Sequence, residues 1–235
     1  MKKLIVVVND LERSGKSSVA RAITHHLSTL EVNHLAVTSN EMDMTDTFTG
    51  EFWDLEDQFD LSLMIGAIDN HDAIVLDVHT GAARVWGELC EEHDLENLLA
   101  ELDTEMTLVV TDTRTERCNE EICDIAELFA DQADYIIAHL PGDERTEMVW
   151  KGSLAAKALK YLGGTEVEIP APSDDLKTGL STAEVELAKA LNNPAGLPRF
   201  TEVPLTQWLE RTSVSLNNAR EYLIPEEVGI VALDY

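Results

Sequence analysis

Short apolar runs recur along this chain, and segments with helical spacing lie between them. The runs are LIVVV (4–8), HLAVTS (34–39), AIVLDV (73–78), MTLVVTDT (106–113), ADYIIAHL (133–140) and the shorter TEVEIPAP (165–172). Strands that are apolar throughout are buried on both faces, which is typical of a parallel sheet covered by helices on both sides. The sequence therefore predicts an α/β fold with a doubly wound, mostly parallel sheet.

The segments between the runs carry apolar residues at helical spacing, and we predict them as helices. They cover residues 15–30, 55–69, 82–102, 116–131, 152–163 and 174–191. A stretch rich in Pro, Gly and Asn at 192–198 marks a boundary. We therefore predict a main domain over 1–192 and a C-terminal extension over 193–235. The extension contains one predicted helix, 205–223, which docks on its own domain or on a partner.

The charge balance is strongly acidic, because 45 Asp and Glu residues against 17 Lys and Arg residues give a net charge of −28. Such a surface repels nucleic acid and anionic lipid, so direct DNA binding is disfavoured. Lys151, Lys157 and Lys160 are nearly the only cationic cluster, which favours a protein partner over DNA. The acidity fits a protein that works in high salt, one that is simply very soluble, or one with a dedicated basic partner.

The cysteines and the apolar runs predict where the protein works. Three cysteines give no disulfide framework, which indicates a reducing cytoplasm. No apolar run approaches the about 18 residues of a membrane helix, so we expect no membrane partner. The N-terminal run is too short for a secretion signal, and we interpret it as a buried first strand.

The first apolar run leads into VVNDLERSGKSS (7–18), whose second half is half of a phosphate-binding loop. The full pattern, G-x-x-x-x-G-K-[ST], joins a buried strand to a helix N-terminus whose backbone N–H groups bind phosphate. Gly15 would let the backbone approach a phosphate, and Lys16 would reach the β- and γ-phosphates. Ser17 would contact Mg²⁺, and Ser18 would contact the α-phosphate or cap the helix. Asp10 stands where the first glycine belongs, and the alternative is an ordinary helix start with serine caps.

A second acidic feature supports the loop, because Asp77 ends the apolar run AIVLDV. In P-loop proteins an acid at the end of another parallel strand helps to hold Mg²⁺. The alternative is a solvent-exposed acid at a strand end. Together the two motifs predict ATP and Mg²⁺ as cofactors, with Ser17 and Asp77 at the metal.

In this register the chain resembles the deviant Walker A ATPases related to ParA and MinD. Asn9 to Ser17 align with the family's N-Q-K-G-G-x-G-K-[ST], and Asp77 to Gly81 align with D-T-P-P-G at the same Asp-to-Gly interval. The order of predicted strands and helices over roughly 3–191 agrees as well. The resemblance implies a P-loop NTPase fold, an ATP-dependent homodimer, and an adaptor or cargo protein as partner.

The resemblance also implies site residues. The phosphate-binding set would be Arg13, Ser14, Gly15, Lys16, Ser17 and Ser18. His139 loosely matches the family residue that contacts the base. The position whose Asp orients the attacking water is Asn40 here, and Glu41 and Asp43 are close enough in sequence to substitute for it. We therefore predict Lys16, Asn40, Glu41 and Asp43 as catalytic residues.

The loop departs from the family in its first half. Leu11 occupies the position of the signature lysine, and Glu12 and Arg13 replace two glycines. Glu12 is unfavourable beside phosphate unless it points away, for example paired with Arg13. Arg13 either takes over from the missing lysine or merely offsets Glu12. With Asn40 in place of Asp, we expect slow hydrolysis, or binding without hydrolysis.

Three functions follow as hypotheses. The first is a nucleotide-switched ATPase that acts through an adaptor in plasmid or DNA partition, cargo positioning or plasmid transfer. The second is a non-hydrolysing nucleotide sensor or scaffold on the same fold, motivated by Leu11 and Asn40. The third is a small-molecule kinase or ligase on a P-loop fold, for which the sequence shows no dedicated acceptor site.

Overall fold

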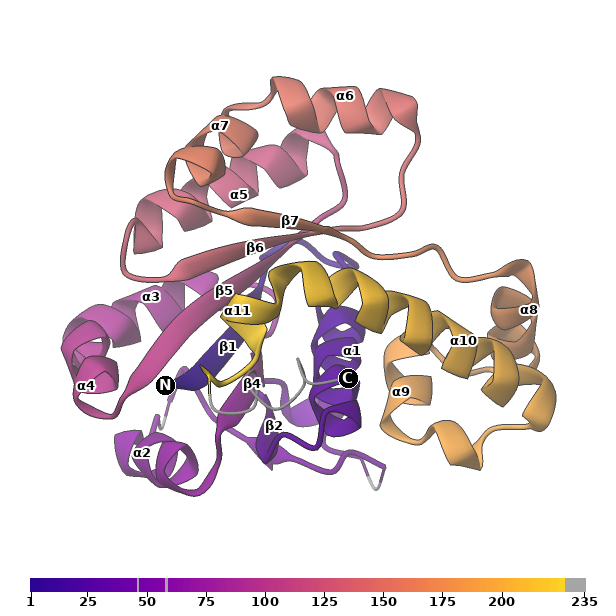
Figure 1. Ribbon diagram of the computed structural model, residues 1–235, viewed down its shortest axis with the longest axis horizontal. Coiled ribbons are helices and arrows are strands. Elements are labelled where there is room, and N and C mark those ends of the chain that lie inside the picture. The colour runs from indigo at the N-terminus through magenta and orange to yellow at the C-terminus, as the bar shows by residue number, and fades with distance from the viewer. Residues whose placement is uncertain (46, 58, 227–235) are drawn as a thin grey trace.

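One parallel sheet organises the computed structural model, which describes residues 1–45, 47–57 and 59–226. Its seven strands have the order β3-β2-β4-β1-β5-β6-β7, and each neighbouring pair is parallel (Figure 1). The strands are β1 (Lys2–Val8), β2 (His34–Thr38), β3 (Glu51–Phe52), β4 (Ala73–Asp77), β5 (Thr104–Asp112), β6 (Asp134–His139) and β7 (Thr165–Glu168). The predicted α/β fold with a doubly wound parallel sheet is confirmed.

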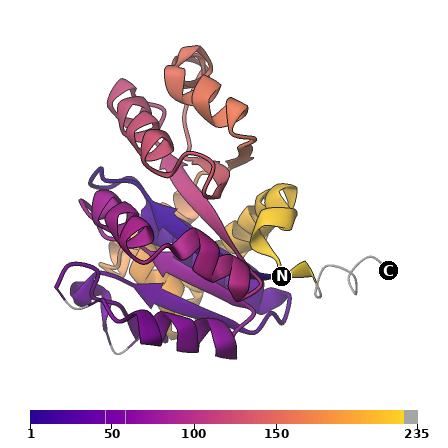
Figure 2. The ribbon, with the colours of Figure 1, turned by 90° about the vertical axis from the view of Figure 1, so that its left-hand side faces the viewer.

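Helices cover both faces of the sheet, and the two layers are visible in Figure 2. The first face carries α2 (Leu61–Asn70), α3 (Ala83–Glu92), α4 (Leu95–Glu101), α5 (Glu116–Phe129), α6 (Glu144–Gly152) and α7 (Leu154–Tyr161). The second face carries α1 (Lys16–Thr29), α8 (Asp174–Thr182), α9 (Leu187–Asn192), α10 (Arg199–Leu216) and α11 (Arg220–Leu223). Strand β1 shows why its run is apolar throughout: Leu4 and Val6 are buried against the first layer, and Ile5 and Val7 against the second.

Two predicted helices are interrupted in the structure. The segment 82–102 forms α3 and α4, which are separated at Asp94, a residue with a left-handed φ of 49°. The segment 174–191 forms α8 and α9, and between them Glu184 has a φ of 53°. Residues in the left-handed region end a helix, because the next N–H groups no longer meet the carbonyls one turn back. Helix α6 was not predicted, and Asp143 begins it with a capping box.

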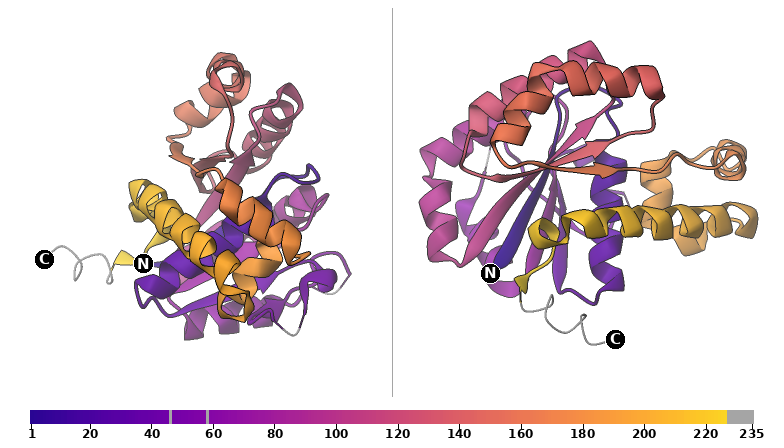
Figure 3. Two further views of the ribbon diagram at one scale, coloured as in Figure 1. Left: turned by 90° about the vertical axis from the view of Figure 1, so that its right-hand side faces the viewer. Right: turned by 45° about the horizontal axis from the view of Figure 1, so that its top comes forward.

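The predicted C-terminal extension packs on the second face. Leu205, Trp208 and Leu216 of α10 share the buried core with α1, and the indole N–H of Trp208 donates to the Pro170 carbonyl at 2.7 Å. Helix α10 packs on α1 and crosses it, as the right-hand view in Figure 3 shows. It spans Arg199–Leu216 rather than 205–223, and residues 227–235 of the extension lie outside the described part of the chain. No helix in that described part is long and apolar enough to cross a membrane.

Candidate nucleotide-binding site

The segment predicted as a phosphate loop joins β1 to α1, and its backbone depends on Gly15. This residue caps α1 with a left-handed φ of 77°, which favours glycine. A Cβ atom built on Gly15 would also lie 2.7 Å from Cδ1 of Leu140, so a side chain there would clash. Beside it, the hydroxyl of Ser14 is buried and has no hydrogen-bond partner among the described residues. The first N–H groups of α1 have no acceptor within the helix, so the loop offers donors to an anion.

In the first half of the loop, Asp10 and Leu11 contact neighbouring parts of the fold. Oδ1 of Asp10 accepts hydrogen bonds from the N–H groups of Gly81 and Ala83, each at 3.0 Å, and ties the loop to the turn before α3. Leu11, at the position of the signature lysine, is half-buried against the core of the first face. Glu12 is exposed and forms no ion pair with Arg13 or with any other residue that the structure describes.

Lys16 is buried at the start of α1, and its ammonium bridges two parts of the site. Nζ donates to the Asn9 carbonyl and to Oγ1 of Thr80, the latter at 3.1 Å. Burial lowers the pKa of Lys16, while Asp77 and other nearby carboxylates oppose that shift. The lysine is therefore held at the point where the loop meets the turn that follows β4.

Asp77 ends β4 and is not a solvent-exposed acid, because only 3% of its surface is accessible. Burial raises the pKa of this carboxyl, and the Arg21 guanidinium and the Ser17 hydroxyl oppose the shift. Nη1 of Arg21 lies 3.2 Å from Oδ2 of Asp77, and the guanidinium also stacks 4.5 Å from the ring centroid of Phe48. The two residues predicted at the metal, Ser17 and Asp77, are thus brought together, with an arginine that stabilises the charged carboxylate.

These elements enclose a cavity of about 230 Å³, which we call the phosphate-loop cavity. Its walls come from the loop, the ends of β2 and β4, the turn after β4, and α9. The lining residues are Arg13, Ser14, Gly15, Lys16, Ser17, Ser18, Asn40, Asp43, Asp77, Val78, His79, Thr80, Glu186, Ala188 and Lys189. Glu41 and His139 were predicted as site residues, and neither belongs to this lining.

The residues predicted to orient water differ in their surroundings. Oδ1 of Asn40 accepts from the N–H of Met42 at 3.1 Å and caps a short 3₁₀ segment, Glu41–Asp43. Glu41 is exposed, whereas Asp43 lines the cavity and accepts a hydrogen bond from Oγ1 of Thr38 at 3.4 Å. Among these three, Asp43 is the carboxylate that faces the cavity. A catalytic role for any of them stays a prediction.

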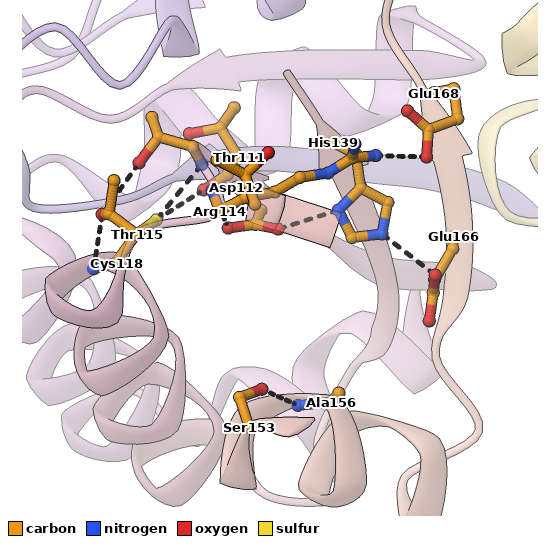
Figure 4. A network of polar contacts seen from close by, with 12 residues as sticks. Thr111, Asp112, Arg114, Thr115, Cys118, His139, Ser153, Ala156, Glu166 and Glu168 are labelled. Atoms are coloured by element: carbon orange, nitrogen blue, oxygen red, sulfur yellow. Dashed lines mark hydrogen bonds and ion pairs between the residues drawn. The ribbon is translucent and has the colours of Figure 1, made fainter. Parts of the chain in front are cut away.

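His139 belongs to a separate grouping at the ends of β5, β6 and β7, which we call the His139 network (Figure 4). Its Nδ1 lies 2.8 Å from Oδ2 of Asp112, and its Nε2 lies 3.0 Å from Oε2 of Glu166. The imidazole and the Trp150 ring pack in a T-shaped arrangement, with centroids 5.0 Å apart. Burial alone would lower the pKa of His139, but the hydrogen bonds to both carboxylates outweigh it and raise the pKa. Contact with a nucleotide base stays a prediction for this residue.

Several lining residues were missed from the sequence. His79 and Thr80 lie within three residues after Asp77, so their place after a strand end was a usable signal. Glu186 and Lys189 lie far along the chain on a helical segment, and no local pattern connects them with the loop. Arg21 resembles any helix residue in sequence, although it holds Asp77 in the structure.

The donor set fits the predicted cofactors. The Ser17 hydroxyl and the Asp77 carboxylate are oxygen groups of the kind that Mg²⁺ prefers, and they lie next to each other. The unpartnered Ser14 hydroxyl and the helix N-terminus provide donors for phosphate. Lys16 adds a cation at the same wall.

The chain is similar in fold to a solved structure. No protein-family model matches the chain, and no curated protein matches it. Among solved structures, a chain of the MinC:MinD cell division protein complex from Aquifex aeolicus matches with a TM-score of 0.53 and 13% identity, over 94% of this chain and 95% of that chain. The chain has a MinD/ParA-like α/β fold with a parallel sheet. At 13% identity the likeness concerns the fold alone.

Proposed function

We propose that this chain is a ParA/MinD-like ATPase of the cytoplasm that binds Mg-ATP in the phosphate-loop cavity. One observation carries the proposal: Lys16, Ser17 and Asp77, from two separate strand–turn units, converge on one cavity behind a glycine-capped helix. This combination of cation, hydroxyl and carboxylate at a helix N-terminus is what a nucleoside triphosphate with its metal requires.

The residues divide the work in this proposal. The backbone around Gly15 and the Ser14 hydroxyl donate to the phosphates, and Lys16 exchanges its contact with Thr80 for a phosphate oxygen. Ser17 and Asp77, which contact each other, would hold Mg²⁺ and its water shell. When bound, the metal would offset charge on the phosphates. Asp43, which lines the cavity, would orient a water, with Asn40 and Glu41 beside it in the chain.

The biological role is proposed from the resemblance and from the charge. ATP would promote a homodimer that recruits an adaptor or cargo protein, in partition of DNA or plasmids, in positioning of cargo, or in plasmid transfer. The matched solved structure is a complex of two proteins, MinC and MinD, which supports a partner of this kind. A net charge of −28 opposes direct DNA binding.

A second candidate is a nucleotide sensor or scaffold that binds ATP without turnover. Two observations favour it: Leu11 packs against the core where the family has its lysine, and Asn40 uses its side-chain oxygen on Met42. A small-molecule kinase or ligase has no observation in its favour.

The test is ATP binding and steady-state hydrolysis with Mg²⁺, at low and high salt, for wild type and Lys16→Ala. We expect Lys16→Ala to weaken ATP binding on the order of a hundredfold, because it removes a charge-assisted contact from a buried site. Lys157→Ala is the matched control, since Lys157 is exposed on α7. Turnover in wild type supports the ATPase, and binding without turnover supports the sensor. The proposed site would be refuted if Lys16→Ala kept both ATP binding and hydrolysis, or if wild type bound no ATP.

A further inference from the structure

The phosphate-loop cavity has a wall that the loop motifs do not supply. This wall is α9, whose Lys189 lines the cavity together with Glu186 and Ala188. It faces a cavity that also contains Lys16 and Arg13. The cavity therefore presents cationic side chains from the loop on one side and from the C-terminal part of the chain on the other.

Helix α9 is fixed next to the loop by two contacts. Ala190 is buried in the core of the second face, at 1% exposure. Asn192 accepts a hydrogen bond from Nε of Arg21 at 2.8 Å, and the same guanidinium pairs with Asp77. Lys189 thus stands on a helix whose position is tied to the buried carboxylate at the end of β4.

The side chain of Lys189 has unused capacity. It is exposed, and its ammonium makes no hydrogen bond or ion pair with any residue that the structure describes. By contrast, Lys16 already donates to Asn9 and Thr80, and Arg21 already holds Asp77. In a chain with a net charge of −28, a free ammonium at the mouth of a phosphate site is a local exception.

Charge decides what this ammonium can bind. The cavity contains three carboxylates, Asp43, Asp77 and Glu186, and a bound triphosphate would add further negative charge. The buried Lys16 and the exposed Arg13 leave that charge poorly balanced. A lysine is a point charge on a long flexible stem, suited to reach phosphate oxygens from a neighbouring element.

We propose that Lys189 binds the phosphate chain of the nucleotide, so that α9 is the second cationic wall of the site. The inference rests on the proposed function and adds a residue and an element to it. The ligand class is a nucleoside di- or triphosphate, and the contribution of Lys189 grows with the number of phosphates.

The test compares the affinities of ATP, ADP and AMP for wild type, Lys189→Ala, Lys189→Arg and Lys177→Ala by calorimetry with Mg²⁺. Lys177 is the matched control, because it is an exposed lysine of the neighbouring helix α8 that pairs with Asp174 and lines no part of the cavity. We expect Lys189→Ala to weaken ATP binding about tenfold or more, ADP less and AMP least. Lys189→Arg should retain most of the affinity, and Lys177→Ala all of it.

The outcomes separate the two proposals. If wild type binds ATP and Lys189→Ala binds it equally well, the role of Lys189 is wrong and the proposed function stands. If Lys189→Ala weakens ATP, ADP and AMP by the same factor, the residue supports the fold of the wall and not the phosphates, and the inference is also wrong. If wild type binds no nucleotide, both fail. A thermal melt of each variant verifies folding, and Lys189→Gln replaces Lys189→Ala if the latter unfolds.

Discussion

Two buried polar groupings lie at the carboxyl edge of the same sheet, and they are built differently. In the phosphate-loop cavity, Lys16 and Asp77 face about 230 Å³ of space, and the Ser14 hydroxyl has no partner among the described residues. In the His139 network, both ring nitrogens of His139 already contact carboxylates, and Trp150 packs on the ring. Buried charge alone therefore does not mark a ligand site. A site also needs polar groups whose hydrogen-bonding capacity faces a cavity.

We expect the largest change in stability when the ion pair between Arg21 and Asp77, at the phosphate-loop cavity, is broken. Arg21→Met removes the partner of Asp77 and leaves a carboxylate that is 3% exposed without its counter-charge. We expect a loss of about 3–5 kcal/mol in the free energy of unfolding, because an unpaired buried charge is strongly destabilising. Urea denaturation measures it.

Arg84→Met is the control for this loss. Arg84 is 82% exposed and pairs with Glu88 on the surface of α3, so its removal should change stability by less than about 0.5 kcal/mol. Equal effects of Arg21→Met and Arg84→Met would mean that Asp77 gains water when Arg21 is lost. The Arg21–Asp77 ion pair would then contribute no more to stability than a pair on the surface.

The next effect concerns the His139 network. His139→Gln leaves at least one of its two carboxylate contacts unmade, and Asp112 is fully buried. We expect a loss of about 1–3 kcal/mol in unfolding free energy, with ATP affinity unchanged. Denaturation and calorimetry on the same variant measure both. Reduced ATP affinity at unchanged stability would instead support the sequence prediction that His139 contacts the base.

The smallest effect is the pH dependence of that network. The pKa of His139 is raised in the folded chain, because the two carboxylate hydrogen bonds outweigh burial. Its stabilising contribution should be complete below the pKa of about 6.5 for an unfolded histidine, and should decline as pH rises through the raised value. The stability difference between wild type and His139→Gln, measured from pH 5 to pH 9, should therefore shrink with rising pH. A difference that grows with pH would contradict the assignment.

His26 should change stability with pH in the opposite direction from His139, so it serves as the internal control. It is also buried, but neither ring nitrogen has a hydrogen-bond partner among the described residues. Burial, with Arg220 and His25 nearby, lowers its pKa to about 4. Its stabilising contribution is present above about pH 6.5 and is lost as pH falls toward 4. In a plot of unfolding free energy against pH, His26→Phe should remove the loss of stability between about pH 6.5 and pH 4. The loss of stability with rising pH that we assign to His139 should remain.

Much of the fold could be predicted because the relevant patterns are local. Each apolar run predicted a strand, since a strand buried on both faces must be apolar at every position, as β1 shows. The loop was found for the same reason, because Gly15, Lys16 and Ser17 are consecutive. The interruptions at Asp94 and Glu184 were missed, since a left-handed backbone at an ordinary residue has no strong local signature.

The sequence by itself determined the parallel sheet, the Gly-Lys-Ser turn after its first strand and the place of Asp77, because these depend on residues next to one another in the chain. The tertiary structure decided what the loop meets. It paired Asp77 with Arg21, used Asp10 to cap the next turn, and brought Lys189 of α9 to the cavity. Such contacts join residues far apart in sequence. Only the packing of helices on the sheet fixes which of many similar side chains come together, and no local pattern records that choice.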